Sequence, residues 1–374
     1  MLGTTMPTPM YAIYGEQMNF SVLTTTVIYA AYAGGVLVAL LAFGRWSDAI
    51  GRRPLLLGGV VAALVSAGVF LAADSVPLLL VARVLSGLSA GVFTGTATAA
   101  VIESAPEHWR GRAAAVATVA NIGGLGAGPV LAGILVQYAP HPLHLSFIVH
   151  IALAAFAGAA VLLVPETSPR AGRISVQRLS VPAQVRSVFV VASLAGFAGF
   201  AVTGLFAAVA PSFVVDVVGI DNQALAGAIA GSIFLASAVT QVAANRMAAQ
   251  NAVAIGCAIL VVGMVILAAA LQLSSLAGLI AAAVVAGVGQ GLTFSRGLAA
   301  VSERTPADRR AEVNSTYFVI VYVAISLPVI GEGLAAEHWG LRTAGVTFAV
   351  AVAVLAAGCL VAILARAKRA APAG

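Results

Sequence analysis

The chain has 374 residues, of which 61% are hydrophobic and 9% are charged, and its mean hydropathy is +1.05. Soluble globular chains are about 45–50% apolar and about 25% charged, so this composition excludes a soluble fold. The net charge of +6 would raise the question of nucleic acid in a soluble protein, but basic cytoplasmic loops explain it better, and we expect no nucleic-acid partner.

Apolar runs of about 20 residues recur along the whole chain, which is the length that a helix needs to cross the hydrocarbon core of a bilayer. We therefore predict an all-α membrane protein with eleven full transmembrane helices, preceded by a partial helix 1. The predicted spans of helices 2 to 12 are residues 20–43, 55–73, 76–101, 113–137, 145–164, 188–212, 223–244, 252–273, 275–301, 313–335 and 342–365.

The opening of the chain is too short for a span. Only about a dozen residues precede a loop that we predict at residues 15–19, whereas about 20 are needed to cross the bilayer. We expect the chain to begin inside helix 1, through an internal start or a true deletion, and the upstream coding region to encode a further apolar stretch.

Basic residues predict the orientation, because short cytoplasmic loops collect Lys and Arg. If residues 44–54 are cytoplasmic, every basic residue falls on that side except Arg83 and Arg296, which lie inside spans, and Arg342. We expect a plasma (inner) membrane protein whose termini are both cytoplasmic in the complete protein.

The two halves of the chain resemble each other at a shift of 200 residues. This shift superimposes Gly87 on Gly287, Gly91 on Gly291, Glu103 on Glu303, Pro106 on Pro306, Arg110 on Arg310 and Gly133 on Gly333. Such a repeat predicts two six-helix bundles related by a parallel repeat. The halves would be residues 1–164 and 188–374, joined by a cytoplasmic linker at 165–187 that contains Pro169 and Arg173.

The loop after the first full span carries Gly44, Asp48, Gly51, Arg52 and Arg53. It resembles the signature loop between helices 2 and 3 of the major facilitator superfamily. Its glycines suit a tight reversal, and its arginines suit anionic headgroups. The resemblance implies that Asp48 is a gate latch, which braces helix 2 against helix 11 and favours the outward-open state. A generic positive-inside loop is the alternative, but it would not need an acid between the two glycines.

Helix 4 contains an arginine, and a charge within a span is costly and marks a pathway or a partner. Arg83 followed by Gly87 resembles the helix 4 motif of proton-coupled family members, which implies a role in coupling. The alternative is that Arg83 snorkels to the periplasmic interface. In helix 11, Glu332 lies close to the periplasmic end, and we expect a solvated rim residue there.

Helix 5 contains a glycine-rich stretch with one proline, formed by Gly124, Gly128, Pro129 and Gly133. The stretch resembles the antiporter signature of the 12-helix, proton-coupled drug-efflux branch, although Ala132 stands where that signature has glycine. Small residues also let helices approach closely, so a plain packing seam is the alternative.

The resemblance places the substrate cavity mainly among helices 1, 4, 7 and 10. The candidate substrate contacts are Tyr11, Thr94, Asn121, Phe197, Phe200, Phe206, Gln290, Phe294 and Tyr317. Most of them are apolar or aromatic, which suits a hydrophobic, weakly charged ligand.

The resemblance thus implies a secondary active transporter that exports small hydrophobic compounds in exchange for protons and works as a monomer in the lipid bilayer. An exporter of a sugar, amino acid or other metabolite, and a transport-inactive truncated membrane protein, are the alternatives. We expect no cofactor, no metal and no enzyme activity, because the five histidines form no metal or nucleophile constellation. The sequence shows no phosphate-binding loop, which argues against ATP as the energy source.

Overall fold

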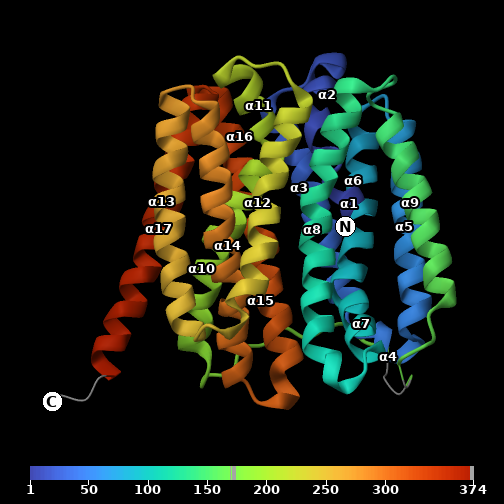
Figure 1. The fold of residues 1–374 in the computed structure, drawn as a ribbon, viewed down its shortest axis with the longest axis vertical. Helices are drawn as coiled ribbons and strands as arrows, with labels where there is room; N and C mark the ends of the chain where they lie inside the picture. The colour runs from blue at the N-terminus through green and yellow to red at the C-terminus, as the bar shows by residue number, and fades with distance from the viewer. Residues whose placement is uncertain (169, 171–173, 371–374) are drawn as a thin grey trace. The chain divides into compact units, whose positions relative to one another are not determined.

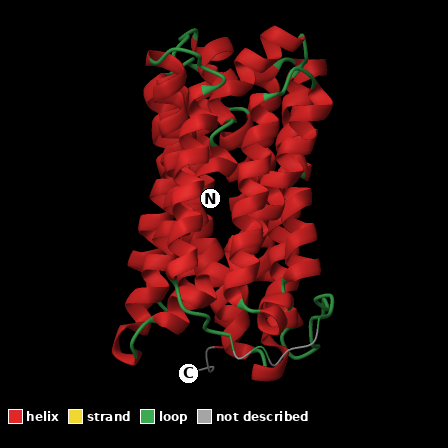
Figure 2. Ribbon diagram, turned by 90° about the vertical axis from the view of Figure 1, so that its right-hand side faces the viewer, coloured by secondary structure: helices red, strands yellow, loops and turns green. Residues whose placement is uncertain are grey.

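The computed structural model describes residues 1–168, 170 and 174–370. Pro169 and Arg173 of the predicted linker lie outside the described residues. All the regular structure in the described part is helical (Figure 2). Eleven helical spans there are long and apolar enough to cross a membrane, which confirms the predicted number of full spans.

The spans follow the apolar runs closely, because a membrane helix satisfies all of its backbone hydrogen bonds within itself. Figure 1 shows them running roughly side by side within each half of the chain. In chain order they are α3 (Val22–Phe43), α5 (Arg52–Leu71), α6 (Val76–Val92) continued by α7 (Thr98–Ser104), α8 (Arg110–Tyr138), α9 (Leu145–Leu163), α10 (Arg186–Ala208), α12 (Gln223–Ala243), α13 (Ala249–Gln272), α14 (Leu276–Arg304), α15 (Arg310–Ala324) with α16 (Leu327–Trp339), and α17 (Leu341–Ala370).

The chain divides into two compact units. Unit 1 comprises Met1–Arg178 and Asn222–Gly231, and unit 2 comprises Leu179–Asp221 and the chain from Ser232 onward. Residues 222–231, which the sequence assigns to the second half, thus group with unit 1 in the structure.

Glycines on α6 and α14 show the same packing in the two units. A Cβ atom at Gly87 would strike the carbonyl oxygen of Tyr32 on α3, and one at Gly287 would strike that of Ile233 on α12. The helix ends also correspond, since α7 ends at Ser104 and α14 at Arg304. A short 3₁₀ turn follows in each unit, and α8 and α15 then begin at Arg110 and Arg310. The predicted internal repeat is confirmed by these equivalent contacts and boundaries.

The opening segment folds into three short helical pieces in unit 1, α1 (Leu2–Thr5), a 3₁₀ turn at Thr8–Met10, and α2 (Tyr11–Met18). The N-terminus lies about midway along the helices of this unit (Figure 1). The loop predicted at residues 15–19 is wrong in its extent, because α2 continues through Met18. Only Asn19, whose φ is 52°, leaves the helix.

The span at 307–339 is interrupted near its middle. Pro328 has no N–H to donate to the carbonyl of Ala324, where α15 ends. The Ser326 hydroxyl donates to the carbonyl of Tyr322, so one carbonyl left free at the break is satisfied. The break separates α15 from α16.

Candidate functional site

The loop between α3 and α5 folds around a glycine that no other residue could replace without strain. Gly51 has a φ of +115°, a conformation that L side chains rarely adopt, and a Cβ there would strike the Glu166 carboxylate. Before it, the five-residue helix α4 (Trp46–Ile50) carries Asp48 in its first turn. Gly44 ends α3 with ordinary helical φ and ψ. The loop therefore places Asp48 one turn before Arg52 at the start of α5.

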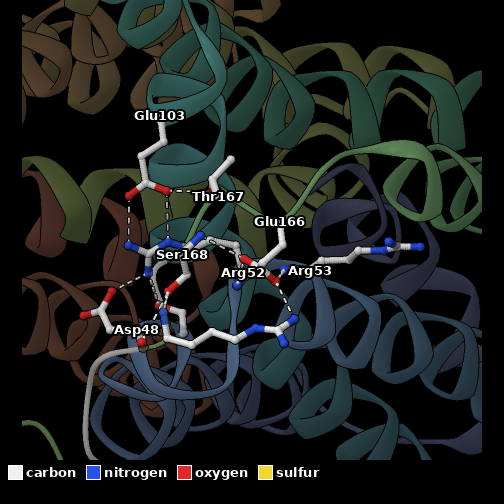
Figure 3. Close-up of polar contacts among 9 residues, drawn as sticks. Asp48, Arg52, Arg53, Glu103, Glu166, Thr167 and Ser168 are labelled. Atoms are coloured by element: carbon white, nitrogen blue, oxygen red, sulfur yellow. Dashed lines mark hydrogen bonds and ion pairs between the residues drawn. The ribbon is translucent and has the colours of Figure 1, made fainter.

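Arg52 is the centre of a polar cluster in unit 1. Its guanidinium lies 2.6 Å from Asp48 and 2.9 Å from the carboxylate of Glu103 on α7, and it also donates to the Ser47 hydroxyl. Figure 3 shows the guanidinium between the two carboxylates. Its side chain is only 13% exposed, whereas that of Asp48 is 58% exposed. Arg52 is therefore the buried element of the motif, and Asp48 is the accessible one.

Glu166, from the segment after α9, caps the N-terminus of α5. Its carboxylate accepts hydrogen bonds from the backbone N–H groups of Arg52 (2.8 Å), Arg53 (3.2 Å) and Ser168 (3.0 Å). Burial alone would raise the pKa of this carboxyl, but the three N–H donors and the nearby Arg170 charge outweigh it and hold the pKa below its ordinary value. The first N–H groups of a helix have no partner within it, so this acid stabilises the start of the span.

The same segment is fastened at two further points. The Thr167 hydroxyl donates to Glu103 at 2.7 Å, and the Ser168 hydroxyl donates to the Asp48 carbonyl at 3.3 Å. The side chain of Arg53 extends away from this cluster (Figure 3). The structure thus brings Asp48, Gly51 and Arg52 together and places the Arg53 side chain apart.

Sequence reasoning missed four members of this cluster: Glu103, Glu166, Thr167 and Ser168. The sequence did single out Glu103, because the 200-residue shift superimposes it on Glu303. In unit 2, Glu303 also pairs with an arginine, since its carboxylate lies 4.0 Å from Arg296. The other three lie in an irregular segment whose pattern gives no periodicity to read.

Arg83 lies inside unit 1 and is fully buried. Its guanidinium donates to the Thr4 carbonyl and to the Tyr11 hydroxyl, and it lies 5.1 Å from the centre of the Tyr11 ring. The rings of Tyr29 and Phe70 approach it at 5.8 and 6.0 Å. The snorkelling alternative does not hold, because both hydrogen bonds point into the unit. None of the described contacts of this arginine is with a carboxylate.

The glycine-rich stretch of α8 has neighbours on two sides within unit 1. A Cβ at Gly128 would strike the Leu2 carbonyl, and one at Gly124 would lie 3.1 Å from the Met1 side chain. On the other side, a Cβ at Gly133 would lie 2.5 Å from the Gln223 carbonyl at the start of α12. These glycines therefore form a packing seam, which the sequence left open as the alternative to an antiporter signature. An antiporter role for the seam stays a prediction.

Three of the predicted cavity residues meet in an aromatic cluster of unit 2. The Phe294 ring on α14 lies 4.9 Å from that of Phe200 on α10 and 6.1 Å from that of Tyr317 on α15. Phe318 and Tyr322 extend the cluster at 6.1 Å from Phe294 and 6.5 Å from Phe200. Sequence reasoning missed Phe318 and Tyr322, although they follow Tyr317 on α15 by only one and five residues.

The remaining predicted cavity residues are dispersed. In unit 2, Gln290 is buried and accepts a hydrogen bond from Ser237, and Phe206 is buried in α10. In unit 1, Tyr11 contacts Arg83. Thr94 lies in a π turn between α6 and α7, and its hydroxyl donates a hydrogen bond to the Ala90 carbonyl. Asn121 is half-buried on α8.

Phe197 and Glu332 lie near each other in unit 2. Both line a pocket of unit 2 formed by α10, α16 and α17. The expectation that Glu332 is a solvated rim residue is wrong, because its side chain is only 3% exposed. The register of α16 turns this residue inward.

Comparison with known proteins agrees with this architecture. The family model described as Major Facilitator Superfamily matches residues 1–327. The human organic anion transporter MFSD10 has the same fold, with a TM-score of 0.64 over 91% of this chain and 83% of that one at 18% identity.

Similarity to curated relatives is confined to shorter stretches. The class E tetracycline resistance protein of Escherichia coli is 33% identical over 111 residues, which is 29% of this chain and 26% of that protein. The uncharacterized MFS-type transporter YhjO of Bacillus subtilis is 27% identical over 154 residues, covering 41% of this chain and 38% of that one. Because the family match extends over most of its length and agrees with the eleven spans and the internal repeat, the chain belongs to the Major Facilitator Superfamily of membrane transporters.

Proposed function

We propose that this protein is a proton-coupled exporter of small hydrophobic compounds, which works by alternating access as a monomer in the plasma membrane, with both termini of the complete protein on the cytoplasmic side. The observation that carries the proposal is Arg83, a fully buried cation with no described carboxylate contact inside a membrane unit. A buried charge is stabilised only by partners, and its energy changes strongly when a proton or a ligand arrives nearby.

Two further observations support this function. The Arg83 guanidinium connects α6 to the opening segment through Thr4 and Tyr11, so a change in its surroundings acts on the position of that segment. The aromatic cluster around Phe294 offers an apolar surface of the kind that hydrophobic ligands contact. This surface also favours hydrophobic compounds over sugars, which need many polar partners.

The direct test is transport by everted membrane vesicles with and without an imposed pH gradient, using a panel of hydrophobic compounds that includes tetracycline. We expect accumulation that depends on the gradient and is lost in both Arg83→Ala and Arg83→Lys, because a lysine cannot reproduce the two-directional hydrogen bonding of the guanidinium. Tyr11→Phe, which removes one hydrogen bond, should reduce the rate partially.

Arg296→Ala is the matched control, since it also removes one arginine from a span, and it should transport like the unmodified chain at equal membrane level. Gradient-independent transport, or full activity of Arg83→Ala, would overturn the coupling role. Absence of transport for every compound would favour the transport-inactive alternative.

We also propose that Asp48 and Arg52 form a gate latch. Asp48→Asn removes the 2.6 Å ion pair but leaves Arg52 bound to Glu103, so the loop should stay folded while its accessible charge is lost. We expect at least a tenfold loss of net transport at a near-normal membrane level. Transport at the unmodified rate would show that the acid serves only the loop.

A further inference from the structure

Glu332 is a carboxylate without a partner. It is 3% exposed, and neither of its carboxyl oxygens has a hydrogen-bond partner in the described structure. Among the described side chains it is the one acidic group that is buried. It lies seven residues before the end of α16, which places it about 10 Å inside the end of the span.

This carboxylate lines an apolar cavity of about 380 Å³ in unit 2. Phe197 of α10, Phe348 of α17 and Trp339 at the end of α16 supply aromatic rings to the lining. Glu332 is the only charged side chain that α10, α16 and α17 contribute to it, and Thr347 and the Trp339 indole supply the other polar side-chain atoms. Thr347 and Ala351 are exposed, so the cavity opens on the surface of α17.

An unpaired carboxylate in such a place must bind a positive charge. Transfer of an isolated carboxylate into an apolar medium is strongly unfavourable, so the group holds either a proton or a cation. Aromatic rings attract cations over their faces, and most strongly when the cation is poorly hydrated. The volume suits a small organic ligand, and the apolar lining disfavours a hydrated metal ion.

We propose that this cavity is a binding site for a lipophilic organic monocation, such as an aromatic ammonium, with Glu332 as its counterion. The cation and the proton compete for the same carboxylate, so binding of one cation releases one proton from the protonated acid. This site is separate from Arg83, and the proposal concerns binding alone. If the cavity does not bind the cation, the proposed transport function is unaffected. If transport fails its own test, the proposed binding site is unaffected.

The test uses the full chain in phosphatidylcholine nanodiscs with Trp46→Phe and Trp109→Phe, which leaves Trp339 as the single tryptophan. The probe is benzyltrimethylammonium, and its uncharged isostere neopentylbenzene is the comparison. We expect saturable quenching of Trp339 fluorescence by the cation, with proton release in weakly buffered solution. The apparent dissociation constant of the cation should fall about tenfold for each unit by which the pH is raised, as long as Glu332 is protonated in the empty cavity.

Glu332→Gln should abolish both the quenching and the proton release, and Glu337→Gln is the matched control, because it removes an exposed carboxylate from the same helix. Thr347→Phe, which fills the mouth and leaves the acid in place, should weaken binding at least tenfold even if Glu332→Gln does not fold. Equal binding of the neutral isostere, retained binding in either cavity variant, or binding without proton release would overturn the proposal.

Discussion

Single charges have well-defined surroundings in unit 1. Arg52 is surrounded by two carboxylates and a hydroxyl from two different segments, α4 and α7. Glu166 accepts hydrogen bonds from two backbone N–H groups at the start of α5 and from one in its own segment. Each of these two charges has at least one partner that is distant in sequence. Removal of one partner should therefore weaken the contacts between segments more than it changes any one helix.

Glu166→Gln should lower the free energy of unfolding by about 1–2 kcal/mol at neutral pH, because it removes the charge from three hydrogen bonds, two of them at a helix start. The pKa of Glu166 is lowered by folding from its ordinary 4.5. Its contribution is therefore fully present above pH 4.5 and is lost as the pH falls through the lowered value. Thermal unfolding of both proteins across this range measures the difference.

Glu107→Gln is the control for that experiment, since its carboxylate is 90% exposed and lies 4.0 Å from Arg110. Exposed pairs contribute little, so this variant should unfold like the unmodified chain at every pH. A pH-independent difference for Glu166→Gln would show that the charge of this carboxyl is not what stabilises the helix start.

At the scale of helices, the contact between α8 and the opening segment depends on a proline. Pro129 has no N–H, so the carbonyl of Leu125 lacks its donor within the helix. The Thr5 hydroxyl donates to that carbonyl at 2.7 Å. Gly124 and Gly128 let the opening segment come close enough for this bond. The proline and the packing seam are therefore linked, because the Thr5 hydroxyl satisfies the carbonyl that the proline leaves without a donor.

Thr5→Val should destabilise the protein by about 1–3 kcal/mol, because it leaves the Leu125 carbonyl unsatisfied. In a Pro129→Ala background, the new N–H at position 129 can serve this carbonyl, so the same change should cost less than half as much. Thermal unfolding of the four proteins of this double-mutant cycle measures the coupling.

Thr8→Val is the matched control for this cycle, because the Thr8 hydroxyl is buried in the same segment without a partner. It should be neutral or slightly stabilising. Equal effects of Thr5→Val in both backgrounds would show that the threonine does not substitute for the missing donor.

At the scale of the whole molecule, large apolar side chains remain exposed within the spans. Phe156 is 75% exposed, and Val239 and Val354 are 69% and 67% exposed. A soluble protein would not leave so many apolar groups in water, but a bilayer solvates them. These exposed side chains agree with the eleven spans and require that the connecting loops lie in water on one side or the other.

Orientation can be tested at two exposed loop positions of unit 1. In a background without Cys257 and Cys359, we expect an impermeant maleimide to label Asp74→Cys in intact cells and Val176→Cys only in everted vesicles. The reason is that basic residues concentrate on the side of residue 176. Equal protein levels on immunoblots are the control, and labelling of position 176 from outside would reverse the topology.

The amino-acid sequence by itself determined the class of fold. Spans, their limits to within a few residues, the 200-residue repeat and the Gly51 turn all follow from local composition, because hydrophobic length and backbone freedom are properties of short segments. An internal placement of Arg83 was one of two predictions that the sequence allowed, since a charge within a span must find partners or reach the interface. The partners of Arg83, Thr4 and Tyr11, could not be predicted from the sequence.

Only the tertiary structure decided the contacts between distant segments. The partnership of Arg52 with Glu103, the capping of α5 by Glu166 and the burial of Glu332 depend on helix rotation and on the path of an irregular segment. A rotation of one residue, 100° around a helix, moves a carboxylate from solvent to an apolar cavity. Hydropathy averaged over a span does not register such a rotation, so the surroundings of each charge are settled only when the helices pack.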